Sequence, residues 1–206
     1  MIAFPKVPLK YPKNIMVNTL TIPKNPSLET FLALPETKPA QEYFNSHIYQ
    51  KPMPQGKHSK LQITLASQIN QQAESKRIAY AFTELRCTFA GRSLVPDITV
   101  FEWDHIPLDE NSEILNKITI APDWIIEILS PEQSSLQLVE KISFALKNGT
   151  KLGWLISPSD RLVMVFQGDR LPETQTENDI LPVLVELENW TITPQIIFNW
   201  LNFSQH

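Results

Sequence analysis

A glutamate in the middle of an apolar run constrains this chain more than any other feature. Glu127 lies in the run Trp-Ile-Ile-Glu-Ile-Leu at 124–129, between Pro-Asp and Ser-Pro. A short apolar run bounded by turn residues is typical of a central strand that is covered on both faces. A carboxylate buried in such a strand is costly unless a positive group pairs with it. The sequence therefore predicts a central strand over 122–129 and a charged partner for Glu127.

Two charged residues elsewhere in the chain are candidates to meet Glu127. Asp97 begins a predicted strand within 94–103, and Lys141 lies in a predicted helix over 136–148 among apolar neighbours at helical spacing. If the two strands are neighbours, side-chain alternation lets Asp97 and Glu127 converge at one point. Two carboxylates a few Å apart cannot both stay ionised without a cation, and Mg²⁺ or Mn²⁺ accepts oxygen ligands of this kind. Two acids and a lysine in this arrangement suit a divalent metal that hydrolyses a phosphodiester.

Each of these residues also has a structural interpretation, which the residues alone leave open. Asp97 could end a strand, and Glu127 could bond a backbone amide. Lys141 could pack its stem against the core and keep its amine in water. Many folds carry an acid on each of two strands, so the spacing by itself is weakly specific.

Length and composition predict one folded domain. The chain has 206 residues, of which 42% are hydrophobic, and this is enough for a single core. Residues 1–26 contain five prolines and few periodic signals, so we expect an extended N-terminal arm there and a single domain over 27–206. No apolar run reaches the roughly 18–20 residues that span a bilayer. The start of the chain also lacks a signal peptide, so no membrane association is expected.

Charge and cysteine content narrow the setting. Cys87 is the only cysteine and cannot form an internal disulfide, which favours a cytoplasmic location. The net charge of −4 argues against a general nucleic-acid coat protein, which would show a basic footprint. It is compatible with a nuclease, because acidic metal ligands lower the net charge while a local basic patch can still meet phosphates.

Periodicity predicts an α/β (α+β) fold with a mixed central sheet flanked by helices on both faces. Strands alternate only partly with helices, and hairpins also occur. Besides the segments already named, we expect helices over 28–34, 39–44, 56–76 and 194–201, strands over 48–53, 78–89, 152–156, 162–166 and 183–187, and loops over 104–119 and 170–181.

Several short motifs, taken in order, resemble the Uma-two family of proposed restriction endonucleases. They are Val-Pro-Asp-Ile at 95–98, Pro-Asp-Trp-Ile-Ile-Glu-Ile-Leu-Ser-Pro at 122–131, Glu-Lys at 140–141 and Gly-Thr-Lys-Leu-Gly-Trp-Leu-Ile at 149–156. Upstream, Phe-Leu-Ala-Leu-Pro at 31–35, Glu-Tyr at 42–43 and Met-Pro-Gln-Gly-Lys-His at 53–58 resemble the family's amino-terminal half. The resemblance runs from about residue 28 to about residue 201, and the number and order of the motifs make it fairly specific.

The resemblance implies a restriction-endonuclease-like fold of the PD-(D/E)XK type. In that pattern Asp97 and Glu127 would be the metal-binding acids and Glu42 an additional catalytic acid. The lysine that normally stands two positions after the second acid is replaced by Leu129 and would have moved to Lys141. His58 falls where the family often has a histidine, which makes it an accessory candidate.

The sequence departs from the family pattern at three places, one of them a pair of residues. Asn45-Ser46 replaces a turn that usually ends in glycine, Gln137 stands where many members have aspartate, and Ser157 stands where aspartate usually precedes proline. These departures keep a second function class open: a catalytically weak or inactive nuclease-fold protein that binds nucleic acid or a protein partner. A third possibility is a structural α/β module whose buried acid belongs to a polar network.

The favoured hypothesis is a Mg²⁺- or Mn²⁺-dependent endodeoxyribonuclease. Asp97 and Glu127 would hold the ion, Lys141 and Glu42 would assist, and DNA would be the substrate. Because such folds often cut both strands as dimers, we also expect a homodimer.

Overall fold

A computed structural model describes residues 26–131 and 133–204, so the predicted arm over 1–26 lies almost wholly outside the described residues. Its helices are α1 (Leu28–Leu32), α2 (Gly56–Ala73), α3 (Ser135–Lys147) and α4 (Pro194–Asn199), with 3₁₀ turns η1 (Glu74–Lys76), η2 (Trp103–His105) and η3 (Val185–Leu187). Its strands are β1 (Gln41–Phe44), β2 (His47–Gln50), β3 (Ala79–Thr83), β4 (Cys87–Phe89), β5 (Arg92–Leu94), β6 (Ile98–Glu102), β7 (Trp124–Ile128), β8 (Leu152–Ser157), β9 (Leu162–Gln167) and β10 (Glu173–Thr176).

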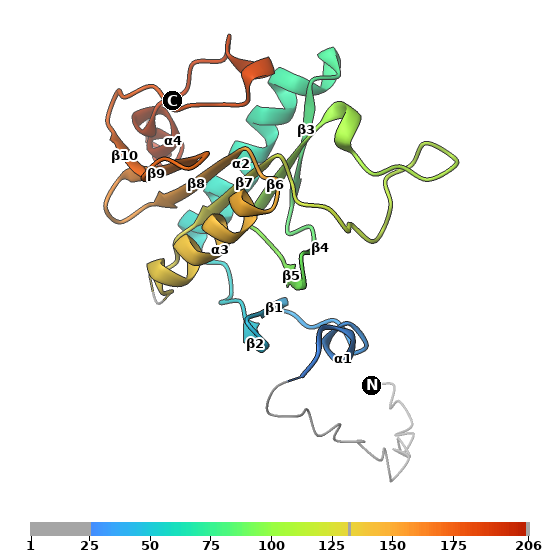
Figure 1. Cartoon of the computed structure of the whole chain (residues 1–206). Helices are drawn as coiled ribbons and strands as arrows, with labels where there is room; N and C mark the ends of the chain where they lie inside the picture. Colours follow the sequence, from blue (N-terminus) through green and yellow to red (C-terminus); the bar gives the residue numbers. More distant parts are fainter. Residues whose placement is uncertain (1–25, 132, 205–206) are drawn as a thin grey trace, which may run out of the picture.

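The larger of two sheets forms the centre of the molecule. Its strand order is β10-β9-β8-β7-β6-β3, and β7 pairs with β8 in parallel while the other neighbours are antiparallel. Helix α3 connects β7 to β8 across one face, and α2 covers the opposite face (Figure 1). The predicted α+β fold with helices on both faces of a mixed sheet is therefore confirmed.

Side-chain alternation along β7 divides the core into two layers. Trp124, Ile126 and Ile128 pack in the layer under α2, whereas Ile125 packs in the layer under α3. Glu127 has the same parity as Ile125 and so points toward α3. All five residues of β7 are buried, as expected for a central strand. None of the helices in the described part of the chain is long and apolar enough to cross a membrane.

The smaller sheet brings the amino-terminal region to one end of the larger sheet. It has the strand order β2-β1-β5-β4, and β5 leads directly into the segment before β6. The β1–β2 turn places Asn45 and Ser46 at φ 51° and 61°. Two successive positive φ values normally favour glycine, so the departure from the family pattern at this turn is accommodated by asparagine and serine.

Some sequence predictions were wrong in detail. The segment 39–44 is not helical, because Gln41–Phe44 pairs in register with the following strand and buries Tyr43 and Phe44. The segment predicted as a strand over 183–187 contains a 3₁₀ turn instead. The segment predicted as a loop over 170–181 contains β10, an edge strand that pairs with β9. The strand predicted over 78–89 is broken between β3 and β4, where Glu84 adopts φ 51°. The strand predicted over 94–103 is also interrupted. Leu94 ends β5, and β6 begins only at Ile98, after Pro96, which cannot donate a hydrogen bond to the sheet.

Candidate functional site

The first two predicted site residues meet because β6 and β7 are neighbours. The strands run antiparallel with Ile98 opposite Ile126, so Asp97 just before β6 reaches the end of β7 that carries Glu127. Asp97 Oδ2 accepts a hydrogen bond from the backbone N–H of Ile128 at 2.7 Å. Asp97 is therefore attached directly to the strand of the second acid, and both carboxyl groups are buried.

Asp97 also has two side-chain partners. Lys51 Nζ, from the segment after β2, lies 2.7 Å from Oδ1, and His58 Nε2, in the first turn of α2, lies 3.0 Å from Oδ2. Burial by itself would raise the pKa of the Asp97 carboxyl, but Lys51 and His58 outweigh burial and hold this pKa well below its usual range. Asp97 is an anion held by three protein donors.

Glu127 is held differently, by a single cation. Lys141 Nζ lies 2.7 Å from Glu127 Oε1 and 2.5 Å from Glu42 Oε1, so the ammonium joins α3 to both β7 and β1. Apart from this ion pair, neither oxygen of Glu127 has a hydrogen-bond partner among the described residues. Burial raises the pKa of Glu127 to about 7, since Lys141 offsets only part of the cost and Asp97 adds repulsion. Burial also opposes the charge on Lys141, yet Glu127 and Glu42 raise its pKa above the ordinary value.

Glu42 ties the smaller sheet to this cluster. Its Oε1 accepts a hydrogen bond from the backbone N–H of Val95 at 2.6 Å, and the Val95 carbonyl accepts from Lys51 Nζ at 2.7 Å. Lys141 Nζ approaches the same carbonyl at 3.4 Å. The structure thus brings Asp97, Glu127, Lys141 and Glu42 together, with His58 behind Asp97.

The charges of this cluster fit a bound cation. Three carboxylates, from Glu42, Asp97 and Glu127, face two ammonium groups, from Lys51 and Lys141. The cluster thus holds one more carboxyl group than ammonium groups. The carboxylate oxygens of buried Glu127, of which Oε2 has no partner among the described residues, are donors of the hard type that Mg²⁺ and Mn²⁺ prefer.

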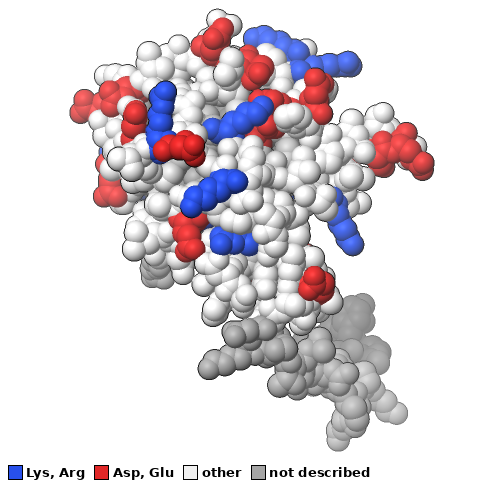
Figure 2. Space-filling view, viewed as in Figure 1, with Lys and Arg blue, Asp and Glu red and all other residues white. Residues whose placement is uncertain are grey.

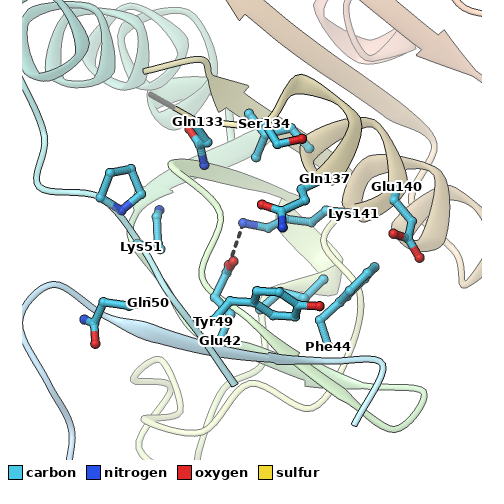
Figure 3. A pocket seen from close by; sticks show the side chains of 13 residues that line it. Glu42, Phe44, Tyr49, Gln50, Lys51, Gln133, Ser134, Gln137, Glu140 and Lys141 are labelled. Atoms are coloured by element: carbon cyan, nitrogen blue, oxygen red, sulfur yellow. Dashed lines mark ion pairs between the residues drawn. The ribbon is translucent and has the colours of Figure 1, made fainter. Parts of the chain in front are cut away.

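A pocket of about 370 Å³ opens onto the cluster between the smaller sheet and α3. Figure 3 shows Glu42, Lys51 and Lys141 extending into it from β1, from the segment after β2 and from α3. Gln137, another departure from the family pattern, lies on its α3 wall. Glu42, Lys51 and Lys141 line this pocket, whereas Asp97 and Glu127 are buried beside it.

Lys51 is the site residue that sequence analysis missed. The signal that existed was the charge balance, because three clustered acids and one lysine leave a deficit of positive charge. That deficit indicates a further cation without saying which lysine supplies it. The pairing of β1 with β2 positions Lys51, which directly follows β2, so that its ammonium contacts Asp97.

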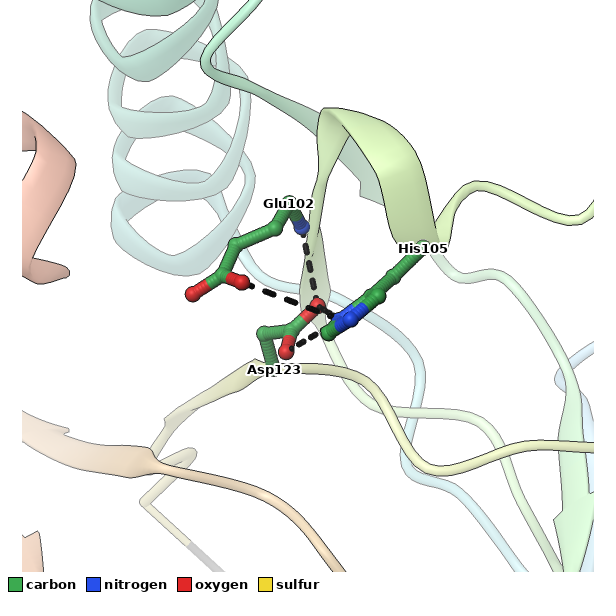
Figure 4. A group of neighbouring side chains, drawn as sticks. All are labelled: Glu102, His105 and Asp123. Atoms are coloured by element: carbon green, nitrogen blue, oxygen red, sulfur yellow. Dashed lines mark hydrogen bonds and ion pairs between the residues drawn. The ribbon is translucent and has the colours of Figure 1, made fainter.

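A second group of metal-ligand type lies at the opposite end of β6 and β7. Ligand atoms of Glu102, His105 and Asp123 all lie within 4.8 Å of one another (Figure 4). His105 Nδ1 lies 2.9 Å from Asp123 Oδ1, and Lys151 Nζ lies 2.5 Å from Glu102 Oε2 and 3.2 Å from Asp123 Oδ1. The carboxylates of Glu102 and Asp123 therefore already have Lys151 and His105 as partners. Five residues of strand, or about 16 Å, separate this group from the Asp97 cluster.

The surface carries no continuous basic band on the face shown in Figure 2, where blue and red side chains alternate. Any positive attraction on that face is local. This agrees with the acidic overall charge of −4.

Comparisons with known proteins agree on one family. The sequence profile of the Uma2 family, described as "Putative restriction endonuclease", matches residues 28–195. A crystal structure from Anabaena variabilis, described as "a putative nuclease belonging to DUF820", is 47% identical and superposes with a TM-score of 0.84, covering 85% of this chain and 99% of that one. No curated protein matches the chain.

Proposed function

Because the chain belongs to the Uma2 family, we propose that it is a metal-dependent endonuclease that hydrolyses phosphodiester bonds in DNA. The observation that carries the proposal is the buried cluster of three acids and two lysines at the floor of an open pocket. Such a cluster is expensive for the fold, and the two ammonium groups that line the pocket beside Glu42 can bind an anionic group of a substrate.

Asp97 and Glu127 would hold the metal ion. When bound, Mg²⁺ or Mn²⁺ polarises a phosphoryl oxygen and lowers the pKa of a coordinated water. The protein's own groups then have separate tasks. His58 and the Ile128 amide fix the Asp97 carboxylate, while Glu42 holds the Lys141 ammonium at the pocket floor.

Lys51 and Lys141 would bind the substrate. Both line the pocket and are held by acids, so their ammonium groups are oriented before a phosphate arrives. Positive charge at this position compensates the negative charge that develops on phosphoryl oxygens in the transition state. The pocket wall of α3 and the β1–β2 hairpin would exclude part of the bulk water from that phosphate.

A plasmid-nicking assay with Mn²⁺ or Mg²⁺ tests the proposal. Asp97→Asn and Glu127→Gln should each lower the nicking rate by at least about 100-fold, because each removes a negative ligand. Glu102→Gln is the matched control, since it removes an acid from the other ligand group. Equal rates in wild type and both cluster variants, or a loss confined to Glu102→Gln, would contradict the assignment.

One observation favours a second function, namely binding without cleavage. Both oxygens of Asp97 are already satisfied by Lys51, His58 and a backbone amide, so the protein alone completes this carboxylate. A nuclease fold that only binds DNA or a protein partner would keep this arrangement. Calorimetric titration of wild type and Glu127→Gln with Mn²⁺ separates the two functions. If Mn²⁺ does not bind, or binds both proteins equally, the second function is supported.

The proposal includes a homodimer as the active state on double-stranded DNA. Cleavage of both strands needs two active sites, and a twofold axis would supply them. Sedimentation of the full chain with and without a DNA duplex tests this, and a monomer in both conditions would contradict it.

A further inference from the structure

A second pocket is lined by His58, whose ring contacts Asp97 of the candidate active site. It has a volume of about 350 Å³ and is lined by the whole first turn of α2, together with the segment after β7 and the β8–β9 turn. Gln133 lines both pockets, so the two openings are neighbours. None of the described residues that line this second pocket is acidic.

The first turn of α2 has free donors. The first backbone hydrogen bond of the helix is donated by the N–H of Ser59 to the carbonyl oxygen of Gln55. The backbone N–H groups of residues 55–58 therefore have no partner within the helix. The N-cap residue Gln55 makes no side-chain capping bond, and the first turn holds no acidic residue. An uncapped amino terminus of an 18-residue helix carries partial positive charge, which Lys57 in the same turn increases.

A second, independent observation points to a ligand. Ser130 also lines this pocket and is only 4% exposed, yet its hydroxyl has no hydrogen-bond partner among the described residues. A buried hydroxyl without a partner costs free energy, and an anion oxygen at this position would accept a hydrogen bond from it. The residues that carry the free amides and the free hydroxyl thus line the same pocket from two segments of the chain.

We propose that this pocket, formed by the α2 amino terminus, Lys57 and Ser130, binds a backbone phosphate of the DNA strand next to the phosphate that is cleaved. The inference rests on the proposed function for the identity of the strand. One phosphate lies over Lys51 and Lys141, and the adjoining phosphate reaches the amides of Gly56, Lys57 and His58. His58 separates the two positions, because its ring contacts Asp97 on one side and its backbone belongs to the helix terminus on the other.

Gly56 offers a matched pair of variants. It is the first residue of α2, and a Cβ there would meet nothing within 4 Å. Gly56→Pro removes one proposed N–H donor at a position that proline favours in helices, and Gln55 at φ −96° and ψ 169° tolerates a following proline. Gly56→Ala adds a similar small group and keeps the donor. Ser130→Ala removes the free hydroxyl without leaving another group unpaired.

The first measurement is a titration of the full chain with inorganic phosphate in EDTA, followed by amide NMR. Phosphate should shift the signals of residues 55–58 in wild type and in Gly56→Ala. Gly56→Pro should weaken phosphate affinity about tenfold, the loss expected for one hydrogen bond to a charged group, and Ser130→Ala several-fold. Unshifted signals at 55–58, or equal affinity in the proline and alanine variants, would overturn the inference.

The second measurement identifies the source of the phosphate. Binding of a fluorescent DNA duplex, again in EDTA, should weaken about tenfold in Gly56→Pro relative to Gly56→Ala. Phosphate binding without this effect on DNA would overturn the assignment to the strand. Because neither measurement involves a metal or cleavage, a negative nicking assay with positive titrations would reject the proposed hydrolysis and leave this anion pocket standing.

Discussion

Lys141 Nζ lies 2.7 Å from Glu127 Oε1, and this contact attaches α3 to the middle of the central sheet. Both side chains are buried, so the pair was removed from water at a large cost in desolvation. The same ammonium also contacts Glu42 from the smaller sheet. A single lysine thus links three of the elements that form the candidate active site.

We predict that Lys141→Met destabilises the protein by about 3–5 kcal/mol, because it leaves Glu127 buried without a counter-charge. The double variant Lys141→Met/Glu127→Leu should recover much of that loss, since it removes both buried charges. Urea unfolding of the single and double variants measures the free energies. Additive losses in the double variant would show that the two residues do not depend on each other.

A second prediction concerns Lys51, whose ammonium competes with a metal ion for Asp97. Lys51→Met should raise Mn²⁺ affinity several-fold, since a positive neighbour disfavours a second cation. Nicking should nevertheless fall, because the substrate phosphate loses a contact. Calorimetry and the plasmid assay give the two readouts, and Lys117→Met, in an exposed loop, is the control. Unchanged Mn²⁺ affinity would mean that Lys51 and the ion do not share Asp97.

The sequence predicted the elements whose burial and periodicity agree. The apolar run around Glu127, the helical stripe of α2 and the apolar face around Lys141 each specified one element type, and the structure has these elements. Alternation also predicted that Asp97 and Glu127 would share a face once their strands were neighbours, as the register shows. These are local patterns that one segment can express by itself.

The rest depended on pairing between distant segments. The strand β1 was mistaken for a helical turn because its partner β2 and the burial of Tyr43 exist only in the folded sheet. Lys51 was missed for the same reason, and Ser130 shows no signal in sequence because an unpartnered hydroxyl is a property of packing. Polar residues in β10 read as a loop, although an edge strand needs few apolar residues.

Glu127 should make stability depend on pH. Its pKa is raised from 4.5 to about 7 by burial, so the folded state binds more protons than the unfolded state between these values. The free energy of unfolding should therefore fall as pH rises from about 4.5 to 7, by on the order of 3 kcal/mol. Glu127→Gln should remove this decline, whereas Glu110→Gln in an exposed loop should retain it. Denaturation in EDTA across this range is the measurement, and parallel pH profiles for wild type and Glu127→Gln would contradict the assignment.

The position of α3, and with it Lys141, depends on Gly153 in β8. A Cβ at Gly153 would overlap Ile142 Cγ2 and lie 3.2 Å from Leu146 Cδ1, both on α3. Gly153→Ala should therefore push the helix outward and cost about 1–3 kcal/mol through overpacking. It should also lower nicking, because Lys141 moves with the helix. Thermal unfolding and the plasmid assay measure the two effects, with Gly56→Ala as the control whose Cβ meets nothing. Wild-type stability in Gly153→Ala would show that α3 does not need this close approach to the sheet.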